Sequence, residues 1–173
     1  MPAVHVPAGS TDGELVSTPS GVLLPADIDP FHRRLHRIAP AGLIGQTTQT
    51  TGMRRVEAIS GKTVGAQSLW MGQTHVPAAT ASGNHHHGGS ETAIYVVSGS
   101  PAFVFVDLEG DEPVETRIQT APGDYVFVPP WVPHREENPD PDVEAVVVIA
   151  RTTQEAVVVN LDALDWSEVR PLV

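Results

Sequence analysis

The sequence of 173 residues contains no cysteine. Disulfide bonds, thiolate metal sites and cysteine nucleophiles are therefore excluded, and any metal ion would be held by nitrogen and oxygen donors. Basic side chains are also scarce, because ten lysines and arginines stand against twenty-one acidic residues and the formal net charge is −11. Since nucleic acids and anionic membranes both require a basic footprint, neither is expected as the main partner.

Long apolar runs are absent as well. No stretch approaches the roughly 20 residues that a membrane-spanning helix needs. The first residues, MPAVHVPAGSTDGELV, contain neither a basic region nor a long apolar segment. These features predict no signal peptide and a cytoplasmic protein. A chain of this length is expected to form one domain with a sizeable core.

Proline, glycine, serine and threonine dominate the first 30 residues, which predicts an extended arm with little structure of its own. The segment DPFHRRLHRIAP that follows, residues 29–40, predicts a short helix. Asp29 is a suitable N-cap, Pro30 suits the first helical position, and Pro40 would end the helix.

From residue 53 onward, short runs rich in Val, Ile, Phe and Tyr follow one another, each bounded by Gly, Pro, Asp or Ser. Runs such as TAIYVVSG, AFVFVDL, DYVFVPP and EAVVVIAR are typical of the short strands of an all-β sandwich or barrel. The fold class is therefore predicted to be all-β. We place an N-terminal arm with the short helix at residues 1–50, a barrel at residues 51–160 and a C-terminal tail packed on the barrel at residues 161–173.

Three consecutive histidines stand in the segment ASGNHHHGGSETAIYVVSG, far from either end of the chain. In a strand, residues i and i+2 face the same way, so His85 and His87 would share a face and His86 would point to the opposite one. A further histidine, His134, follows a proline-rich turn in GDYVFVPPWVPHREENP. Imidazoles that converge in this way favour a site for zinc, iron, copper or nickel, and Glu91 could add an oxygen ligand.

These motifs resemble those of the cupin superfamily. The first cupin motif is HxH, three or four residues, Glu, six residues and Gly, and His85 and His87 match its HxH. The second is Gly, five residues, PxG, two residues, His, three residues and Asn. It resembles GDYVFVPPWVPHREEN, in which His134 takes the histidine position and Trp131 stands where the family prefers glycine.

The spacing leaves the fourth metal ligand open. Counted back from Gly99, the usual glutamate position of the first motif falls on Thr92. Glu91 fits the shorter spacing, but a regular strand would turn it outward unless a bulge intervenes. The alternatives are water or another histidine, for which His75 is the natural candidate and His86 a weaker one.

The resemblance covers about residues 60–155 and implies a double-stranded β-helix, the cupin jelly-roll barrel. It further implies a homodimer with one divalent transition metal (Zn, Fe, Mn or Ni) inside each barrel. The metal ligands and catalytic residues would be His85, His87, His134 and Glu91.

Such a centre suggests an enzyme that acts on a small molecule, as in polyketide- or sugar-tailoring cupins. A metal held by neutral imidazoles can support oxygenation if it is redox-active, or metal-assisted carbonyl chemistry of the isomerase, cyclase or dehydratase type. A ligand-binding or sensor cupin without catalysis is the alternative function.

Side chains that point into the barrel are expected to make a mostly apolar cavity, which suits a neutral, aromatic or enolisable molecule. Strand alternation allows only about half of the candidates to point inward. These candidates are Trp70, Gln73, Thr92, Tyr95, Phe105, Tyr125, Phe127 and Trp131.

The charged residues near these motifs are expected mainly at the solvated surface. Arg54, Arg55 and Arg135 could instead receive an anionic group of a ligand. Glu136 and Glu137 are expected to face solvent, unless one of them hydrogen-bonds the adjacent ligand histidine and fixes its tautomer.

Overall fold

The computed structural model describes residues 15–17, 21, 23–25 and 34–169. The chain divides into two compact units, residues 1–36 and residues 37–173. In the first unit, β1 (Leu15–Ser17) pairs antiparallel with β2 (Leu23–Pro25). This hairpin is regular structure that the composition of the segment does not predict.

The short helix predicted over residues 29–40 is not present in its described part. Residues 29–33 lie outside the described residues, residues 34–39 have no helical structure, and a 3-10 turn follows at Pro40–Gly42. Ala39 has an extended backbone with φ −78° and ψ 161°. The ring of a following proline disfavours the helical region for the residue before it, so this proline begins a turn instead of ending a helix.

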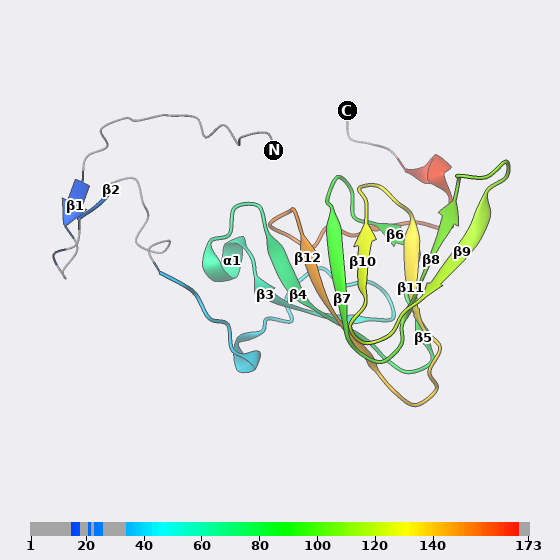
Figure 1. Ribbon diagram of the computed structural model, residues 1–173, viewed down its shortest axis with the longest axis horizontal. Helices are drawn as coiled ribbons and strands as arrows, with labels where there is room; N and C mark the ends of the chain where they lie inside the picture. The colour runs from blue at the N-terminus through cyan, green and yellow to red at the C-terminus, as the bar shows by residue number, and fades with distance from the viewer. Residues whose placement is uncertain (1–14, 18–20, 22, 26–33, 170–173) are drawn as a thin grey trace, which may run out of the picture. The chain divides into compact units, whose positions relative to one another are not determined.

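The second unit is a jelly-roll barrel built from two antiparallel sheets (Figure 1). The five-stranded sheet contains β3 (Arg54–Ile59), β4 (Trp70–Val76), β7 (Thr92–Ser98), β10 (Tyr125–Val128) and β12 (Ala145–Arg151) in the order β10-β7-β12-β4-β3. The six-stranded sheet contains β5 (Thr80–Ala81), β6 (His85–His86), β8 (Ala102–Asp107), β9 (Val114–Gln119), β11 (His134–Asn138) and β13 (Val159–Asn160). Its order is β13-β6-β11-β8-β9, and β5 also pairs with β11.

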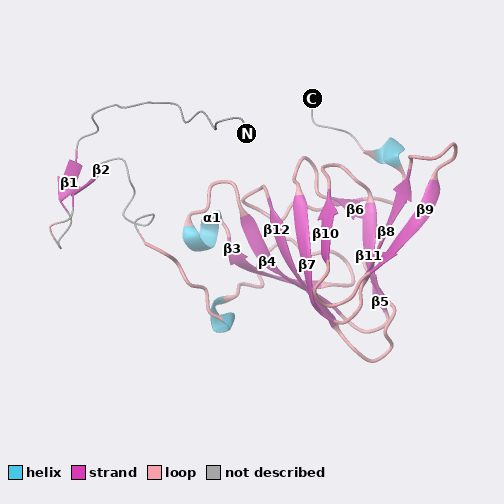
Figure 2. Ribbon diagram, in the orientation of Figure 1, coloured by secondary structure: helices cyan, strands magenta, loops and turns pink. Residues whose placement is uncertain are grey.

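Helical structure in this unit is confined to short pieces outside the sheets, as Figure 2 shows. The helix α1 (Gly61–Val64) begins with a capping box formed by Ser60 and Thr63. A 3-10 turn at Trp166–Glu168 lies beside β8, because the Trp166 indole donates a hydrogen bond to the Val106 carbonyl at 3.4 Å. No helix among the described residues is long and apolar enough to cross a membrane.

The core follows from the two-residue period of the strands. Alternate residues of β4, β7 and β12 are buried, and their apolar side chains pack with those of β8 and β10. The buried core contains Trp70, Ile94, Val96, Phe103, Val128, Val147, Ile149 and Ala156. The same alternation buries Thr92 and Arg151, which are direct neighbours across β7 and β12. Polar groups are thereby placed inside the barrel at the end where Trp70 begins β4.

Candidate metal centre

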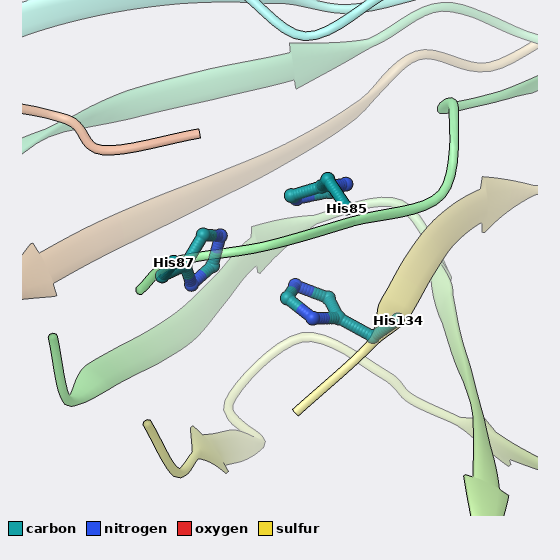
Figure 3. Close-up of side chains that lie close together, drawn as sticks. All are labelled: His85, His87 and His134. Carbon is teal, nitrogen blue, oxygen red and sulfur yellow. The ribbon is translucent and has the colours of Figure 1, made fainter. Parts of the chain in front are cut away.

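The histidines His85, His87 and His134 meet inside this end of the barrel. Register places His85 of β6 opposite His134 of β11, and His87 follows directly after β6. One ring nitrogen from each residue lies within 4.8 Å of the other two, and the three side chains are buried. Figure 3 shows the three rings turned toward one another, with His85 and His87 on one segment and His134 at the start of β11.

The rings of His85 and His134 are oriented by backbone carbonyls. Nδ1 of His85 lies 3.0 Å from the Gly83 oxygen, and Nδ1 of His134 lies 2.9 Å from the Val132 oxygen. Because a carbonyl can only accept, each Nδ1 carries the hydrogen and each Nε2 is left with a lone pair. Both Nε2 atoms are buried and have no hydrogen-bond partner among the described residues. Two buried imidazole lone pairs without partners are a donor set that fits a metal ion.

His87 also carries its hydrogen on Nδ1, but its Nε2 is already bonded. Nδ1 lies 2.8 Å from the Thr92 hydroxyl, and Nε2 lies 2.8 Å from a terminal nitrogen of Arg151. Because a guanidinium can only donate, Nε2 of His87 must be the acceptor, and Nδ1 donates to Thr92. His87 therefore presents the same lone pair as the other two histidines, with Arg151 bound to it.

Burial keeps the three imidazoles neutral. Burial is the main cause that lowers the pKa of His134 to about 4, and the nearby His85 adds to the effect. Burial also lowers the pKa of His85, although Glu136 partly opposes this. The pKa of His87 falls well below its ordinary value because of burial and then the charge of Arg151. Neutral imidazole is the form that binds metal ions.

Arg151 is a buried cation that the sequence analysis did not identify. Its guanidinium also donates to the Val157 carbonyl at 2.8 Å and lies 5.9 Å from the ring centre of Trp70. Burial is the main cause that lowers its pKa to about 9, so the group stays charged at pH 7. The alternation along EAVVVIAR could have revealed it, because Arg151 falls on the same face as Val147 and Ile149.

Glu136 is a buried carboxylate, although the sequence analysis expects it at the solvent. Along β11, His134, Glu136 and Asn138 share the buried face, and Glu136 is only 3% exposed. Its Oε2 lies 3.7 Å from Nε2 of His85 and 3.0 Å from the Ser82 hydroxyl. Burial would raise the pKa of Glu136, but the net shift is downward, and the causes that persist beside neutral imidazoles are the charge of Arg55 and the hydrogen bond with Ser82.

Arg55 also differs from the expected surface position. It lies on the inward face of β3 and is only 1% exposed. Its guanidinium donates to the Thr74 hydroxyl at 3.3 Å, the Thr48 carbonyl at 2.8 Å and the Thr50 hydroxyl at 3.1 Å. These three acceptors are neutral oxygens, so Arg55 makes no direct ion pair with another described residue and contributes positive charge to the barrel interior from a distance.

An apolar cavity of about 290 Å³ reaches the histidine group at His134. Its walls come from β8, β9, β10 and the turn that contains Trp166. Most lining side chains are apolar or aromatic, and they include Phe103, Phe105, Leu108, Ile118, Phe127 and Trp166. A small organic molecule that entered this cavity would meet the histidine group from the His134 side.

The sequence and the fold agree on the family. Residues 72–150 match the sequence model of the cupin domain. The chain contains a cupin domain. Among curated proteins, none matches the sequence at a significant level.

Solved structures similar to this cupin include enzymes. The polyketide cyclase RemF from Streptomyces resistomycificus is 19% identical with a TM-score of 0.58, over 75% of this chain and 87% of RemF. Oxalate decarboxylase from Bacillus subtilis, in a structure at pH 4.6, is 16% identical with a TM-score of 0.56, over 67% of this chain and 29% of that chain. Another structure of the decarboxylase concerns its Mn(II) centres. This chain spans under a third of the decarboxylase, and identities this low show the fold alone.

The structure does not bring Glu91 or His75 to the three histidines. Glu91 is exposed just before β7, and its backbone is paired with Thr152 while the buried face of β7 begins at Thr92. No bulge turns Glu91 inward. His75 lies on the outer face of β4, where its Nδ1 is 2.8 Å from a carboxylate oxygen of Glu144.

Trp131, at the position of the second motif where glycine is expected, has a backbone conformation that favours glycine. Its φ is +68°, in the left-handed region, and its N–H donates to the Gly88 carbonyl at 2.8 Å. A side chain in this region costs about 1–2 kcal/mol, which glycine avoids. The indole packs beside His86, with ring centres 5.5 Å apart, and His86 stays outside the three-histidine group.

The predicted cavity lining is only partly found in the cavity. Phe105 lines it. Phe127 only borders it, because Phe127 is 60% exposed and shares the outward parity of Tyr125 on β10, and Tyr95 points outward for the same reason on β7. The remaining candidates lie elsewhere: Trp70 in the core with its indole donating to Glu57, Gln73 on the outer face of β4, Thr92 against His87, and Trp131 against His86.

Proposed function

We propose that this cupin is a mononuclear, metal-dependent enzyme that converts a small, largely apolar organic molecule carrying a carbonyl or enolisable group. The observation that carries the proposal is the position of the histidine group. The buried, unprotonated Nε2 atoms of His85 and His134 lie close together, and His134 also lines an apolar cavity that is large enough for a small ligand. Similarity in fold to a polyketide cyclase and to a manganese-containing decarboxylase supports a metal-dependent enzyme.

The residues that would hold one divalent transition metal are His85, His87 and His134. Three neutral donors would leave most of the positive charge on the ion, whose Lewis acidity would polarise a carbonyl or stabilise an enolate when bound. Arg151 has to leave Nε2 of His87 before that lone pair can bind a metal, because one lone pair cannot serve both.

The cavity would bind and orient the substrate. Phe103, Phe105, Phe127 and Trp166 offer aromatic faces for an apolar or aromatic molecule, and their burial of the substrate would exclude water. Among the described lining residues, Asp107 is the one charged side chain, and His134 is neutral. A mostly neutral substrate fits this lining better than a polyanion.

We place metal-assisted carbonyl chemistry, of the cyclase, isomerase or dehydratase type, before oxygenation. Carbonyl chemistry requires a Lewis acid and a positioned carbonyl, whereas oxygenation also requires a redox-active metal. Metal identity therefore separates the two reaction classes.

The test is metal content by elemental mass spectrometry on protein purified without a nickel column, followed by activity assays. Carbonyl chemistry would be supported by two results together. The protein would hold about one zinc ion per chain, and it would catalyse deuterium exchange at the α-carbon of an aromatic ketone faster than the H134A variant does. About one iron or manganese ion, with substrate-dependent oxygen consumption, would support oxygenation. A protein that holds no metal and regains none on titration would contradict the enzyme and leave a ligand-binding barrel.

We also propose that the protein is a homodimer, as the cupin resemblance implies. Large apolar side chains are exposed on the outer face of the five-stranded sheet, including Tyr125 at 80%, Val97 at 46% and Tyr95 at 37%. The rings of Tyr95 and Tyr125 lie 4.9 Å apart, so these side chains form a cluster. Exposed apolar clusters are typical of protein interfaces.

A cytoplasmic location stays a prediction from the sequence.

A further inference from the structure

We propose that Glu136 is the fourth ligand of the metal centre and supplies from β11 the carboxylate that the first cupin motif would supply from the start of β7. The inference rests on the proposed metal centre of three histidines. It changes the donor set from three neutral ligands to three neutral ligands and one anion.

The start of β7 offers no carboxylate to the centre. Thr92 takes the usual glutamate position, and its hydroxyl is bonded to Nδ1 of His87. Glu91 is exposed and lies outside the group of three histidines. A carboxylate ligand must therefore come from another strand of the barrel.

β11 brings a carboxylate beside His85. Glu136 lies outside the set of ligand atoms that all come within 4.8 Å of one another, so its side chain would have to turn further inward to share an ion with all three histidines. Because side chains two residues apart share a face of a strand, His134 directs Glu136 inward beside it. Oε2 of Glu136 lies 3.7 Å from the partnerless Nε2 of His85. When His85 carries its hydrogen on Nδ1, neither its Nε2 nor Oε2 of Glu136 has a hydrogen to share with the other. Two lone pairs therefore face each other in a buried space. Two atoms that bind one metal ion, each at about 2.0–2.2 Å, stand about 3–4 Å apart.

The surroundings of Glu136 do not neutralise its charge directly. The neutral imidazole of His85 is the nearest basic group to Oε2 among the described residues, and the closest interaction of Oε2 is with the neutral hydroxyl of Ser82. Arg55 donates three hydrogen bonds to threonine oxygens and acts on Glu136 only through its charge, without a hydrogen bond to it among the described residues. A divalent cation beside His85 would give a partner both to this buried carboxylate oxygen and to the partnerless Nε2 that faces it.

Ser82 contacts both the backbone and the carboxylate of Glu136. The Ser82 hydroxyl lies 3.0 Å from Oε2 of Glu136, and it accepts the Glu136 N–H at 2.9 Å. The Ser82 N–H in turn donates to the Glu136 carbonyl at 2.8 Å. These contacts hold the backbone of Glu136 beside Ser82, while the Ser82 hydroxyl is shared between Oε2 and the Gly83 carbonyl, each at 3.0 Å, so the carboxylate has no exclusive hydrogen bond there.

The test compares metal binding by metal-free wild type, E136Q and E91Q. The Zn²⁺ dissociation constant is measured by competition with a chromophoric chelator, and the visible absorption spectrum of bound Co²⁺ reports the donor set. E136Q should weaken Zn²⁺ binding by about a hundredfold or more, above the roughly 10–100-fold that residues orienting a ligand cost, and should change the Co²⁺ spectrum. E91Q should leave the dissociation constant and the spectrum unchanged.

Circular dichroism of the metal-free proteins checks that E136Q is folded. If it is not, E136D retains the charge on a shorter side chain, and it should bind Zn²⁺ more weakly than wild type and alter the Co²⁺ spectrum. Unchanged binding and spectra in the Glu136 variants would overturn the inference and leave the three-histidine centre standing, with Glu136 acting only as a counter-ion. Loss of binding in E91Q alone would also overturn it. A wild type that binds neither ion would remove both the inference and the proposed function.

Discussion

The histidines on the two sides of the group differ in their hydrogen bonding. On the side of β6 and β11, His85 and His134 have lone pairs without partners, and the Glu136 carboxylate faces one of them. On the side of β7 and β12, both ring nitrogens of His87 are bonded, one to Thr92 and one to Arg151. Histidine therefore lacks a hydrogen-bond partner for Nε2 on the side of β6 and β11, which we call the incomplete side. It has partners for both ring nitrogens on the side of β7 and β12, which we call the complete side.

Metal binding is therefore expected to be favoured by contacts on one side of the group and opposed by contacts on the other. On the first side, an ion would satisfy two buried lone pairs and a buried negative charge. On the second side, it would have to displace the Arg151 guanidinium from His87 and approach its positive charge. The predictions below act on one side or the other.

The largest effect is expected from the incomplete side. H134A removes a lone pair that no other described residue replaces, so metal affinity should fall by more than the roughly 100-fold that orienting residues cost. Metal content after dialysis and the Zn²⁺ dissociation constant measure this. H86A is the matched control, because His86 belongs to the same histidine run but lies outside the group, and its affinity should equal that of wild type. An equal loss in both variants would contradict the assigned strand register.

The stability of the metal-free protein should depend on pH through the same histidine. The pKa of His134 is about 4 in the folded state, below the ordinary value of 6.5, so the unfolded state binds more protons between these values. The stabilisation is present above pH 6.5 and is lost as the pH falls toward 4, and it amounts to about 3 kcal/mol at most. Urea unfolding of wild type and H134Q between pH 7 and 4.5 measures this. A wild type with the same pH dependence as H134Q would contradict it.

The complete side is tested by removing the competing cation. R151M deletes the guanidinium that occupies Nε2 of His87, and a charge-assisted hydrogen bond of this kind contributes about 1.5–3 kcal/mol. Zn²⁺ affinity should rise about tenfold, while the metal-free protein becomes less stable because contacts to Trp70 and Val157 are lost. R135M changes an arginine on the outer side of β11 and should leave Zn²⁺ affinity unchanged, although it removes the ion pairs with Glu115 and Glu137. A fall in affinity in R151M would mean that Arg151 supports the metal centre.

The smallest effect on the metal centre is expected from the outer face of the five-stranded sheet. Y125S and V97S remove exposed apolar area from the proposed dimer surface, so the dimer should dissociate more readily. Size-exclusion chromatography with light scattering measures this. Zn²⁺ affinity should stay unchanged, because both side chains point away from the barrel interior. A monomeric wild type would contradict the dimer.

Much of the barrel could be predicted because it is encoded locally. The runs TAIYVVSG and EAVVVIAR carry the two-residue alternation that buries Ile94 and Ile149, and the same alternation placed His85 and His87 together. It also explains why Glu91 and Tyr95 point outward, since both have the opposite parity to Thr92. The helix expected near Pro40 failed for an equally local reason, namely the restriction that proline imposes on Ala39.

The burial of the charged residues near the histidine group could not be predicted from strand alternation alone. The pattern HREEN shows that His134 and Glu136 share a face of a strand, but the neighbouring charges made a solvated strand the ordinary expectation. Arg55 and Arg151 are far apart in the sequence, and each becomes a buried cation only because its strand pairs with β4.

The sequence by itself therefore determined the strands, the inward parity and the family motifs, because these depend on spacing along one chain. Tertiary structure alone decided which charges are buried together, since the cost of burying Glu136 or Arg151 depends on what the opposite strand presents. It also decided that His87 is bonded and His85 is not. That difference arises where β7 and β12 meet the end of β6, which no single segment contains.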